Sequence, residues 1–205
     1  MEVHCMGLGC DTATTITSRK AQTLVDGGYT FVCRYLGGSF KITSAEKKII
    51  LDAGLRIVSI WESGSPTGIS YFTAEKGRED AEDAIAAADA LGQPSGTPIY
   101  FTVDYDASYS DIRGGIKEYL QAVKAVFAEN NYPYELGLYG SGDVLSYYKN
   151  TYTYTWLAAA TDWSGSKDFT GWSLRQYDPN VTIGSGSGSI QIDRDESNGA
   201  AGGWK

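Results

Sequence analysis

The sequence predicts an α/β fold in which parallel strands, wrapped by helices, close into a barrel. Two observations support this: strand-like and helical segments alternate along residues 5–149, and several of the strands end in polar side chains. The chain has 205 residues, of which 42% are apolar and 20% charged. This length and composition suit one globular domain spanning residues 1–205.

The first ten elements follow one another with short connections. Helices are expected where apolar residues recur at helical spacing, and the second of them begins with a capping box, in which Thr43 caps the amide of Glu46 and the Glu46 side chain returns the bond. Strands are expected at 5–11, 29–36, 55–63, 99–106 and 135–140, and helices at about 17–26, 43–54, 74–91, 111–130 and 142–149.

The pattern changes after residue 150. Strand-like segments at 155–163, 172–177 and 190–195 are separated by only about eight to twelve residues, whereas a parallel crossover needs about a dozen or more. The later helices are therefore short or missing, and at least one neighbouring pair of strands can be antiparallel. We interpret the glycine- and serine-rich tract at 184–189 as a loop. Eight strands with about five helices predict a trimmed TIM-like barrel, and an open doubly wound sheet is the competing architecture.

The charge and hydropathy of the chain restrict the kinds of partner that it can bind. The net charge of −8 argues against nucleic acid and anionic membranes, and no apolar run approaches the roughly 20 residues of a membrane span. The first residues do not form a signal peptide. We expect a monomer that needs no cofactor and is secreted or associated with the cell wall, with a cytoplasmic location as the alternative.

Cysteine and histidine usage excludes several kinds of site. His4 is the single histidine, which disfavours Cys–His dyads, Ser–His–Asp triads and histidine-rich metal sites. Three cysteines form no complete disulfide framework. Cys10 and Cys33 are expected on adjacent parallel strands, both facing the helices as buried thiols.

The segment Ile99–Asp106 is the most informative one. Alternate residues of a strand share a face, so Asp104 and Asp106 are expected to point the same way with their backbones about 7 Å apart. The opposite face, with Ile99, Phe101, Val103 and Tyr105, is apolar and suits packing under helices. Paired carboxylates at a strand tip are typical of glycoside hydrolases.

Other expected strands also end in polar groups that would meet at one rim of a closed barrel. Crowded carboxylates raise one another's pKa and produce an acid that keeps its proton near neutral pH. Each group also has a purely structural explanation, as a helix cap, a salt-bridge partner or a solvated loop residue, and a site for Mg²⁺ or Ca²⁺ is the rival chemistry. These residues are Asp11, Arg34, Glu62, Asp104 with Asp106, and Tyr139.

A series of motifs resembles the glycoside-hydrolase-like domain of unknown function 1906, which is related to the glycoside hydrolase family 25 lysozymes. The resemblance runs from about residue 7 to 196 and implies a barrel with five helices and a peptidoglycan-type substrate. The motifs are Gly9-Cys10-Asp11, Gly28-Tyr-Thr-Phe-Val-Cys-Arg-Tyr-Leu-Gly37, Ala53-Gly-Leu-Arg-Ile-Val58, Pro98-Ile-Tyr-Phe-Thr-Val-Asp-Tyr-Asp106, Leu138-Tyr-Gly140 and Trp156-Leu-Ala158.

The resemblance also implies roles for single residues. Asp11 matches the aspartate that ends the first strand of family 25 lysozymes. Asp104 matches the aspartate, and Asp106 the general-acid glutamate, of their fourth strand. Asp106 is one methylene shorter than that glutamate, and Glu62 is the alternative acid. Asp193 resembles the aspartate of the last strand, and Gln176 and Trp156 resemble groove residues.

These expectations lead to one enzymatic hypothesis and one rival. The enzyme would cleave a β-1,4 bond in an N-acetylated glycan of the peptidoglycan type, with Asp106 as proton donor and Asp104 stabilising the positive charge, directly or through the substrate's N-acetyl group. Asp11 and Asp193 would hold water or tune the pKa of this pair, and Arg34 with Tyr139 would line the groove. The rival is a glycan-binding module that keeps the barrel without the chemistry.

Overall fold

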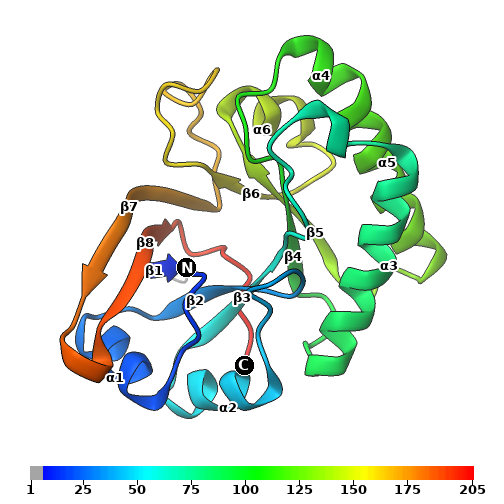
Figure 1. Ribbon diagram of the computed structural model, residues 1–205. Helices are drawn as coiled ribbons and strands as arrows, with labels where there is room; N and C mark the ends of the chain where they lie inside the picture. Colours follow the sequence, from blue (N-terminus) through cyan, green and yellow to red (C-terminus); the bar gives the residue numbers. More distant parts are fainter. Residues whose placement is uncertain (1–6) are drawn as a thin grey trace, which may run out of the picture.

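The computed structural model describes residues 7–205 and shows a closed barrel of eight strands, not an open sheet (Figure 1). Strand neighbours follow the chain order. All pairs are parallel except β7–β8 and β8–β1, which are antiparallel, so the expected antiparallel pairing is confirmed. The predicted strand start at Cys5 and the histidine His4 lie outside the described residues. The strands are β1 (Gly7–Asp11), β2 (Phe31–Tyr35), β3 (Arg56–Trp61), β4 (Pro98–Thr102), β5 (Glu135–Gly140), β6 (Tyr154–Leu157), β7 (Leu174–Ile183) and β8 (Ile190–Ser197).

Helices cover the outside of the ring, mostly after strands β1 to β5. Threonine or serine side chains cap the N-termini of five of them, which fixes where each helix begins. The expected 111–130 helix is divided at Gly114, whose backbone leaves the helical conformation with φ −98° and ψ −115°. The helices are α1 (Ser18–Asp26), α2 (Ser44–Asp52), α3 (Ala74–Leu91), α4 (Tyr109–Arg113), α5 (Gly115–Glu129) and α6 (Gly142–Tyr148).

Two expectations about the last three strands need correction. β6 ends at Leu157, so the predicted continuation to Trp163 is wrong, and β7 and β8 are longer than the sequence indicated. β7 and β8 form a long hairpin, and the 184–189 tract is its connecting loop, with a 3₁₀ turn at Gly186–Gly188. The loop lies against α1 (Figure 1), where Arg19 Nη1 donates to Ser187 Oγ at 2.8 Å.

The apolar core has two layers. The outer layer lies between the strands and the helices and includes Cys10, Ile99, Phe101 and Val103, as predicted for these four. The inner layer fills the barrel with alternate residues of the same strands. Cys33 belongs to this inner layer, so the expectation that it faces the helices is wrong. Parallel strands buried on both faces carry little sequence signal for which residues point inward.

The C-terminal segment fills the end of the barrel where the parallel strands begin. Trp204 forms an antiparallel bridge with Ile57 of β3, and its indole Nε1 donates to Ser59 Oγ at 3.0 Å. Tyr100, inside the barrel, donates its hydroxyl to the Ala201 carbonyl at 3.0 Å. This arrangement leaves the opposite end, where the parallel strands terminate, as the open end.

Within residues 7–205, none of the helices has the length and apolar content needed to cross a lipid bilayer.

Candidate active site

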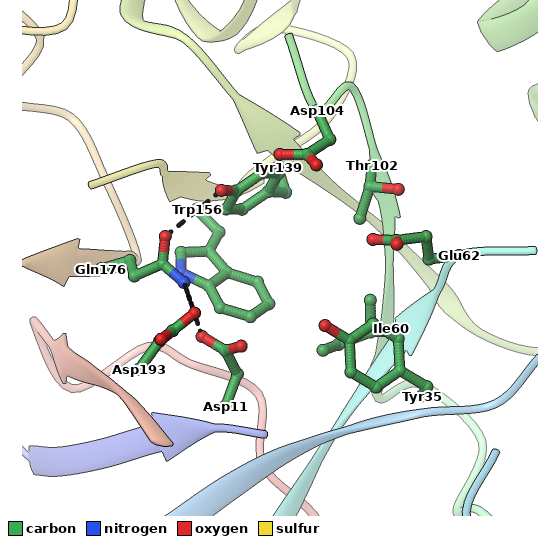
Figure 2. Close-up of a pocket in the computed structure, with 10 residues that line it drawn as sticks. All are labelled: Asp11, Tyr35, Ile60, Glu62, Thr102, Asp104, Tyr139, Trp156, Gln176 and Asp193. Atoms are coloured by element: carbon green, nitrogen blue, oxygen red, sulfur yellow. Dashed lines mark hydrogen bonds between the residues drawn. The ribbon is translucent and has the colours of Figure 1, made fainter. Parts of the chain in front are cut away.

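A pocket of about 160 Å³ lies at the C-terminal ends of the parallel strands. Each of the eight strands places a side chain in it, so the pocket exists only in the closed barrel (Figure 2). The residues that line it are Asp11, Tyr35, Ile60, Glu62, Thr102, Asp104, Tyr139, Trp156, Gln176 and Asp193. The structure therefore brings together seven of the nine residues that the sequence singled out and leaves out Asp106 and Arg34.

Asp104 and Asp106 do not share the pocket. β4 ends at Thr102, and beyond it the Asp104 amide bonds to the Pro66 carbonyl at 3.0 Å, so the chain no longer alternates like a strand. Asp104 still lines the pocket. Asp106 is exposed and accepts a hydrogen bond from the Ser164 amide at 2.8 Å. The prediction that Asp104 and Asp106 form a carboxylate pair at this strand tip is wrong. The family resemblance implied that Asp106 is the general acid, but Asp106 does not line the pocket.

Glu62 and Asp104 form the acidic pair that the pocket contains instead. Glu62 directly follows β3 and faces the side of β4 that carries Thr102 and Asp104 (Figure 2). Burial, followed by the nearby Asp104 charge, raises the pKa of Glu62 to about 7. Burial also raises the pKa of Asp104. Glu62 thus holds its proton in part at neutral pH.

Asp11 and Asp193 stand on the opposite side of the pocket and are bridged by Gln176. The Gln176 Nε2 group donates to Asp11 Oδ2 at 2.8 Å and to Asp193 Oδ2 at 3.2 Å. Its Oε1 atom accepts from the Tyr139 hydroxyl and from the Ala159 amide, both at 3.2 Å. Burial and the neighbouring Asp193 charge raise the pKa of Asp11, and the Gln176 bond partly opposes this.

Asp195 is a buried acid that the sequence interpretation missed. It lies below the pocket, where Trp156 Nε1 donates to its Oδ1 at 3.0 Å and fixes the indole ring that lines the pocket. Burial, with the Asp11 charge, raises the pKa of Asp195 well above its usual value. A signal was available, because Ile190 and Ile192 pack in the outer layer and alternation then turns Asp193 and Asp195 into the barrel.

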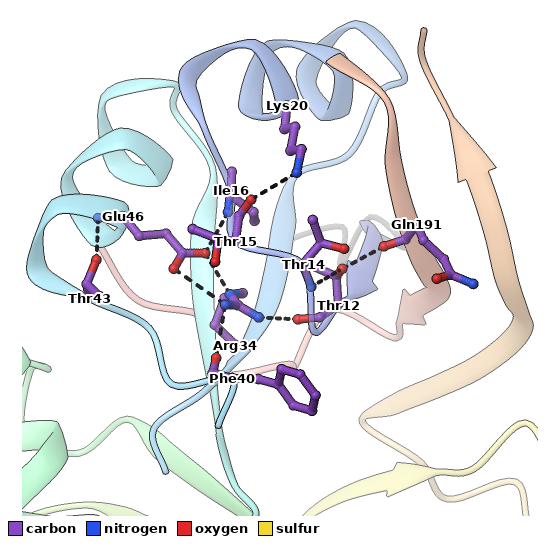
Figure 3. A network of polar contacts seen from close by, with 10 residues as sticks. All are labelled: Thr12, Thr14, Thr15, Ile16, Lys20, Arg34, Phe40, Thr43, Glu46 and Gln191. Atoms are coloured by element: carbon purple, nitrogen blue, oxygen red, sulfur yellow. Dashed lines mark hydrogen bonds and ion pairs between the residues drawn. The ribbon is translucent and has the colours of Figure 1, made fainter. Parts of the chain in front are cut away.

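Arg34 is on the outward face of β2 and does not line the groove, so its predicted position is wrong (Figure 3). Its guanidinium donates from Nε to Glu46 Oε1 at 2.9 Å and from Nη2 to the Phe40 carbonyl at 3.1 Å, and it also bonds to the Thr12 carbonyl. Arg34 is 1% and Glu46 2% exposed. The inward neighbour Tyr35 takes the place in the pocket that was expected for Arg34.

Glu46 also departs from its predicted role. Thr43 accepts from the Glu46 amide at 3.1 Å, as expected, but the Glu46 carboxylate does not return the bond. It pairs with Arg34 and accepts from the Ile16 amide at 2.9 Å. The ion pair and its backbone bonds tie the loop after β1, the loop after β2 and helix α2 into one unit behind the pocket (Figure 3).

The acids of the pocket do not form a recognisable metal site within the described residues. Among residues 7–205, no three histidine, cysteine, aspartate or glutamate side chains gather closely enough to hold a metal ion. Figure 2 shows Asp11 and Asp193 together on the side of Gln176, and Asp104 and Glu62 on the side of Thr102. This arrangement fits an organic ligand placed between two acidic walls.

Comparison with known proteins identifies the family. Residues 22–197 match the model of the Rv2525c-like, glycoside hydrolase-like domain. The uncharacterized protein YbfG of Bacillus subtilis (strain 168) is 39% identical over 206 residues, which cover 91% of this chain and 28% of YbfG. The chain thus spans less than a third of the length of that curated relative.

Two solved structures share the fold. The Tat-secreted protein Rv2525c of Mycobacterium tuberculosis, crystallised with L-tartrate, superposes with a TM-score of 0.78 at 22% identity, covering 98% of both chains. A family 25 glycosyl hydrolase from Bacillus anthracis superposes with a TM-score of 0.56 at 16% identity, covering 93% of this chain and 88% of the other. Because the family model matches most of the chain, from residue 22 to 197, this chain belongs to the family of Rv2525c-like, glycoside hydrolase-like domains.

Proposed function

We propose that this domain hydrolyses β-1,4 glycosidic bonds in a peptidoglycan-type glycan, with Glu62 as the proton donor. The observation that carries the proposal is the pair of facing acids, Glu62 and Asp104, in a pocket where burial and the Asp104 charge raise the pKa of Glu62 to about 7. A carboxylic acid that keeps its proton near neutral pH beside a second carboxylate is what glycosidic bond cleavage requires. The family 25 resemblance supports the choice of glycan.

Each group in the pocket then has a part in the reaction. Glu62 gives its proton to the glycosidic oxygen, and the C1–O bond breaks as positive charge develops on the sugar. The Asp104 carboxylate stabilises that charge. A water molecule adds its hydroxyl to C1 and its remaining proton returns to the Glu62 carboxylate, so one water is consumed for each bond cleaved. Trp156 and Tyr139 offer ring surfaces against which a sugar can pack.

The test is the release of reducing ends from purified peptidoglycan. Glu62→Gln keeps the size of the side chain but removes the proton, so turnover should fall by at least about 10²-fold, the usual share of general acid catalysis. Glu135→Gln makes the same chemical change at an exposed residue at the start of β5, at the opposite end of the barrel, and should leave turnover unchanged.

Two outcomes would reject this assignment. Wild-type turnover by Glu62→Gln would remove Glu62 from the role, and loss of turnover in Asp106→Asn alone would return it to Asp106. Titration of peptidoglycan fragments into the wild-type protein covers the rival function. Binding without any release of reducing ends would identify a glycan-binding module and overturn the hydrolase.

A glycan of this type lies in the cell wall, so we also propose that the domain acts there or outside the cell. The description of the structural neighbour Rv2525c as Tat-secreted supports this location. Immunodetection of the parent protein in cell-wall and culture fractions checks it, and recovery only from the cytosol would contradict it.

A further inference from the structure

The pocket is lined by acids that no nearby base balances. Four of its ten lining residues are acids, and within the described part of the chain none of the ten is a lysine, arginine or histidine. Arg34, on the outer face of β2, is already paired with Glu46 and cannot serve the pocket. Uncompensated carboxylates in a partly closed pocket attract a cation and disfavour an anionic ligand.

The geometry favours an organic cation over a metal ion. Asp11 and Asp193 lie on one wall and Glu62 and Asp104 on the other (Figure 2), and no three acidic, histidine or cysteine side chains among residues 7–205 meet closely enough to coordinate a metal. A primary ammonium needs fewer ligands, since it donates three hydrogen bonds that separate carboxylates can accept. Gln176 holds one oxygen of Asp11, and the other oxygen of this carboxylate is directed into the pocket (Figure 2).

A second observation points independently to a polar ligand. Thr102 lines the pocket and is only 6% exposed, and its hydroxyl Oγ1 makes no hydrogen bond of normal geometry within the described residues, although it lies near enough to the Glu62 carboxylate to lower the pKa of that group. A buried hydroxyl without a partner is costly, and a ligand hydroxyl would supply the missing bond. Aromatic rings of Tyr35, Tyr139 and Trp156 complete the lining, which is the usual surroundings of a sugar ring.

The size of the pocket restricts the ligand further. Its volume of about 160 Å³ is well below the roughly 300–1,000 Å³ of pockets for drug-sized ligands, so it accommodates a single ring and leaves the rest of a chain outside.

We propose that the pocket binds a sugar ring that carries a primary ammonium group, a de-N-acetylated glucosamine unit of the glycan, with Asp11 and Asp193 holding the ammonium and Thr102 bonding a ring hydroxyl. This inference rests on the proposed function in taking a peptidoglycan-type glycan as the ligand. Beyond that function, we expect the pocket to bind partially de-N-acetylated glycan more tightly than fully N-acetylated glycan.

Isothermal titration separates the two ligands without depending on cleavage. Glu62→Gln is the host protein, so that bound glycan is not consumed, and the titrants are β-1,4-linked tetramers of glucosamine and of N-acetylglucosamine. The titration is run near pH 7, because burial and the Asp193 charge raise the pKa of Asp11 to about 8 and a more acidic solution would keep this carboxyl protonated. The glucosamine tetramer should bind at least about tenfold more tightly, the effect of one charge-assisted hydrogen bond. Equal or weaker binding of this tetramer would overturn the proposal.

Two variants test whether the ammonium binds at the wall formed by Asp11 and Asp193. In the same host, Asp193→Asn should remove most of the preference for glucosamine, since it neutralises one of the two carboxylates on that wall. Asp83→Asn makes the identical change on the exposed face of α3 and should keep the preference. A preference that survives Asp193→Asn unchanged would contradict the assignment to this wall. Circular dichroism of each variant shows that the comparison is made between folded proteins.

The ammonium of a peptidoglycan fragment can also belong to a lysine in its peptide. A lysine-containing stem peptide without sugar is therefore titrated in parallel and should bind far more weakly than the glucosamine tetramer. Binding of the peptide as tight as that of the tetramer would overturn the sugar assignment. Failure of wild-type protein to cleave any glycan would reject the hydrolase alone, because the binding preference is measured separately.

Discussion

At the scale of single residues, burial decides which of the acids keeps a proton near neutral pH, whether the residue is an aspartate or a glutamate. Glu62 and Asp104 have raised pKa values because the pocket removes water from them, whereas Asp106 remains exposed and is bonded to a backbone amide. A group whose folded pKa lies above its unfolded value destabilises the fold once pH rises past the unfolded value. Catalytic acidity is therefore obtained here at the expense of stability.

Glu62 should make stability depend on pH in a defined window. Its pKa rises from 4.5 to about 7 on folding, so the folded state binds more protons between these values and the free energy of unfolding falls as pH rises through them. The loss amounts to about 3 kcal/mol at most. Urea unfolding of wild type and Glu62→Gln should therefore agree below pH 4.5 and diverge above pH 7, with the variant more stable.

The ionisation of Glu62 also determines how turnover depends on pH. Turnover should decline as pH rises through about 7, because the proton that Glu62 donates is then lost. If the wild-type protein is as stable as Glu62→Gln above pH 7, Glu62 is not desolvated in the folded state and the predicted pKa shift is contradicted.

Arg34 provides a second prediction at this scale. Arg34→Met leaves the buried Glu46 carboxylate without its cation and should lower the free energy of unfolding by about 3–5 kcal/mol. Arg78→Met is the matched control, because its pairs with Glu82 and Glu129 are on the surface and are worth about 1 kcal/mol or less. Equal midpoints of urea unfolding for the two variants would contradict this account of the network.

At the scale of elements, alternation along each strand decides what reaches the pocket. A shift of one residue moves a side chain to the other face, which is why Tyr35 lines the pocket and Arg34 lies behind it. Where a strand ends matters equally. β4 stops at Thr102, and four further residues of regular strand would have been needed for Asp106 to share the face of Asp104.

Gly9 of β1 allows the inner layer to pack. A Cβ atom at Gly9 would lie 2.0 Å from the ring of Phe31, so Gly9→Ala should lower the free energy of unfolding by at least about 1–3 kcal/mol through overpacking. Gly68→Ala, where a Cβ meets open space and φ is −175°, is the control with little expected effect.

Phe31→Leu should reduce the cost of Gly9→Ala, since the ring atoms in the way are removed. A double-mutant cycle measured by urea unfolding gives the coupling between the two sites. Strict additivity would mean that the two residues do not compete for the same space.

At the scale of the whole molecule, closure of the ring makes the site. β8 runs antiparallel to both β7 and β1, which lets Asp193 and Asp195 enter the barrel beside Asp11 although about 180 residues separate them in the chain. The C-terminal segment then covers the other end through Trp204 and its bonds to β3.

Trp204 should accordingly contribute to the stability of the entire barrel. It is 3% exposed, so Trp204→Ala should cost about 3–5 kcal/mol and lower the midpoint of a single cooperative transition. Tyr109, which is 66% exposed, is the control aromatic, and Tyr109→Ala should shift the midpoint little. Separate transitions for near-UV and far-UV circular dichroism in Trp204→Ala would instead indicate that the segment unfolds independently.

The sequence by itself determined the alternation of strands and helices, the barrel and most of the acids that line its open end. These follow from local patterns: periodicity, capping residues and polar groups where strands terminate. It did not determine that Asp106 would leave the pocket, that Arg34 would turn outward to Glu46, or that Asp195 would lie beneath Asp11. Only the tertiary structure decided these, because strand ends, the inward phase of strands buried on both faces, and the burial that shifts a pKa all depend on contacts between residues distant in the chain.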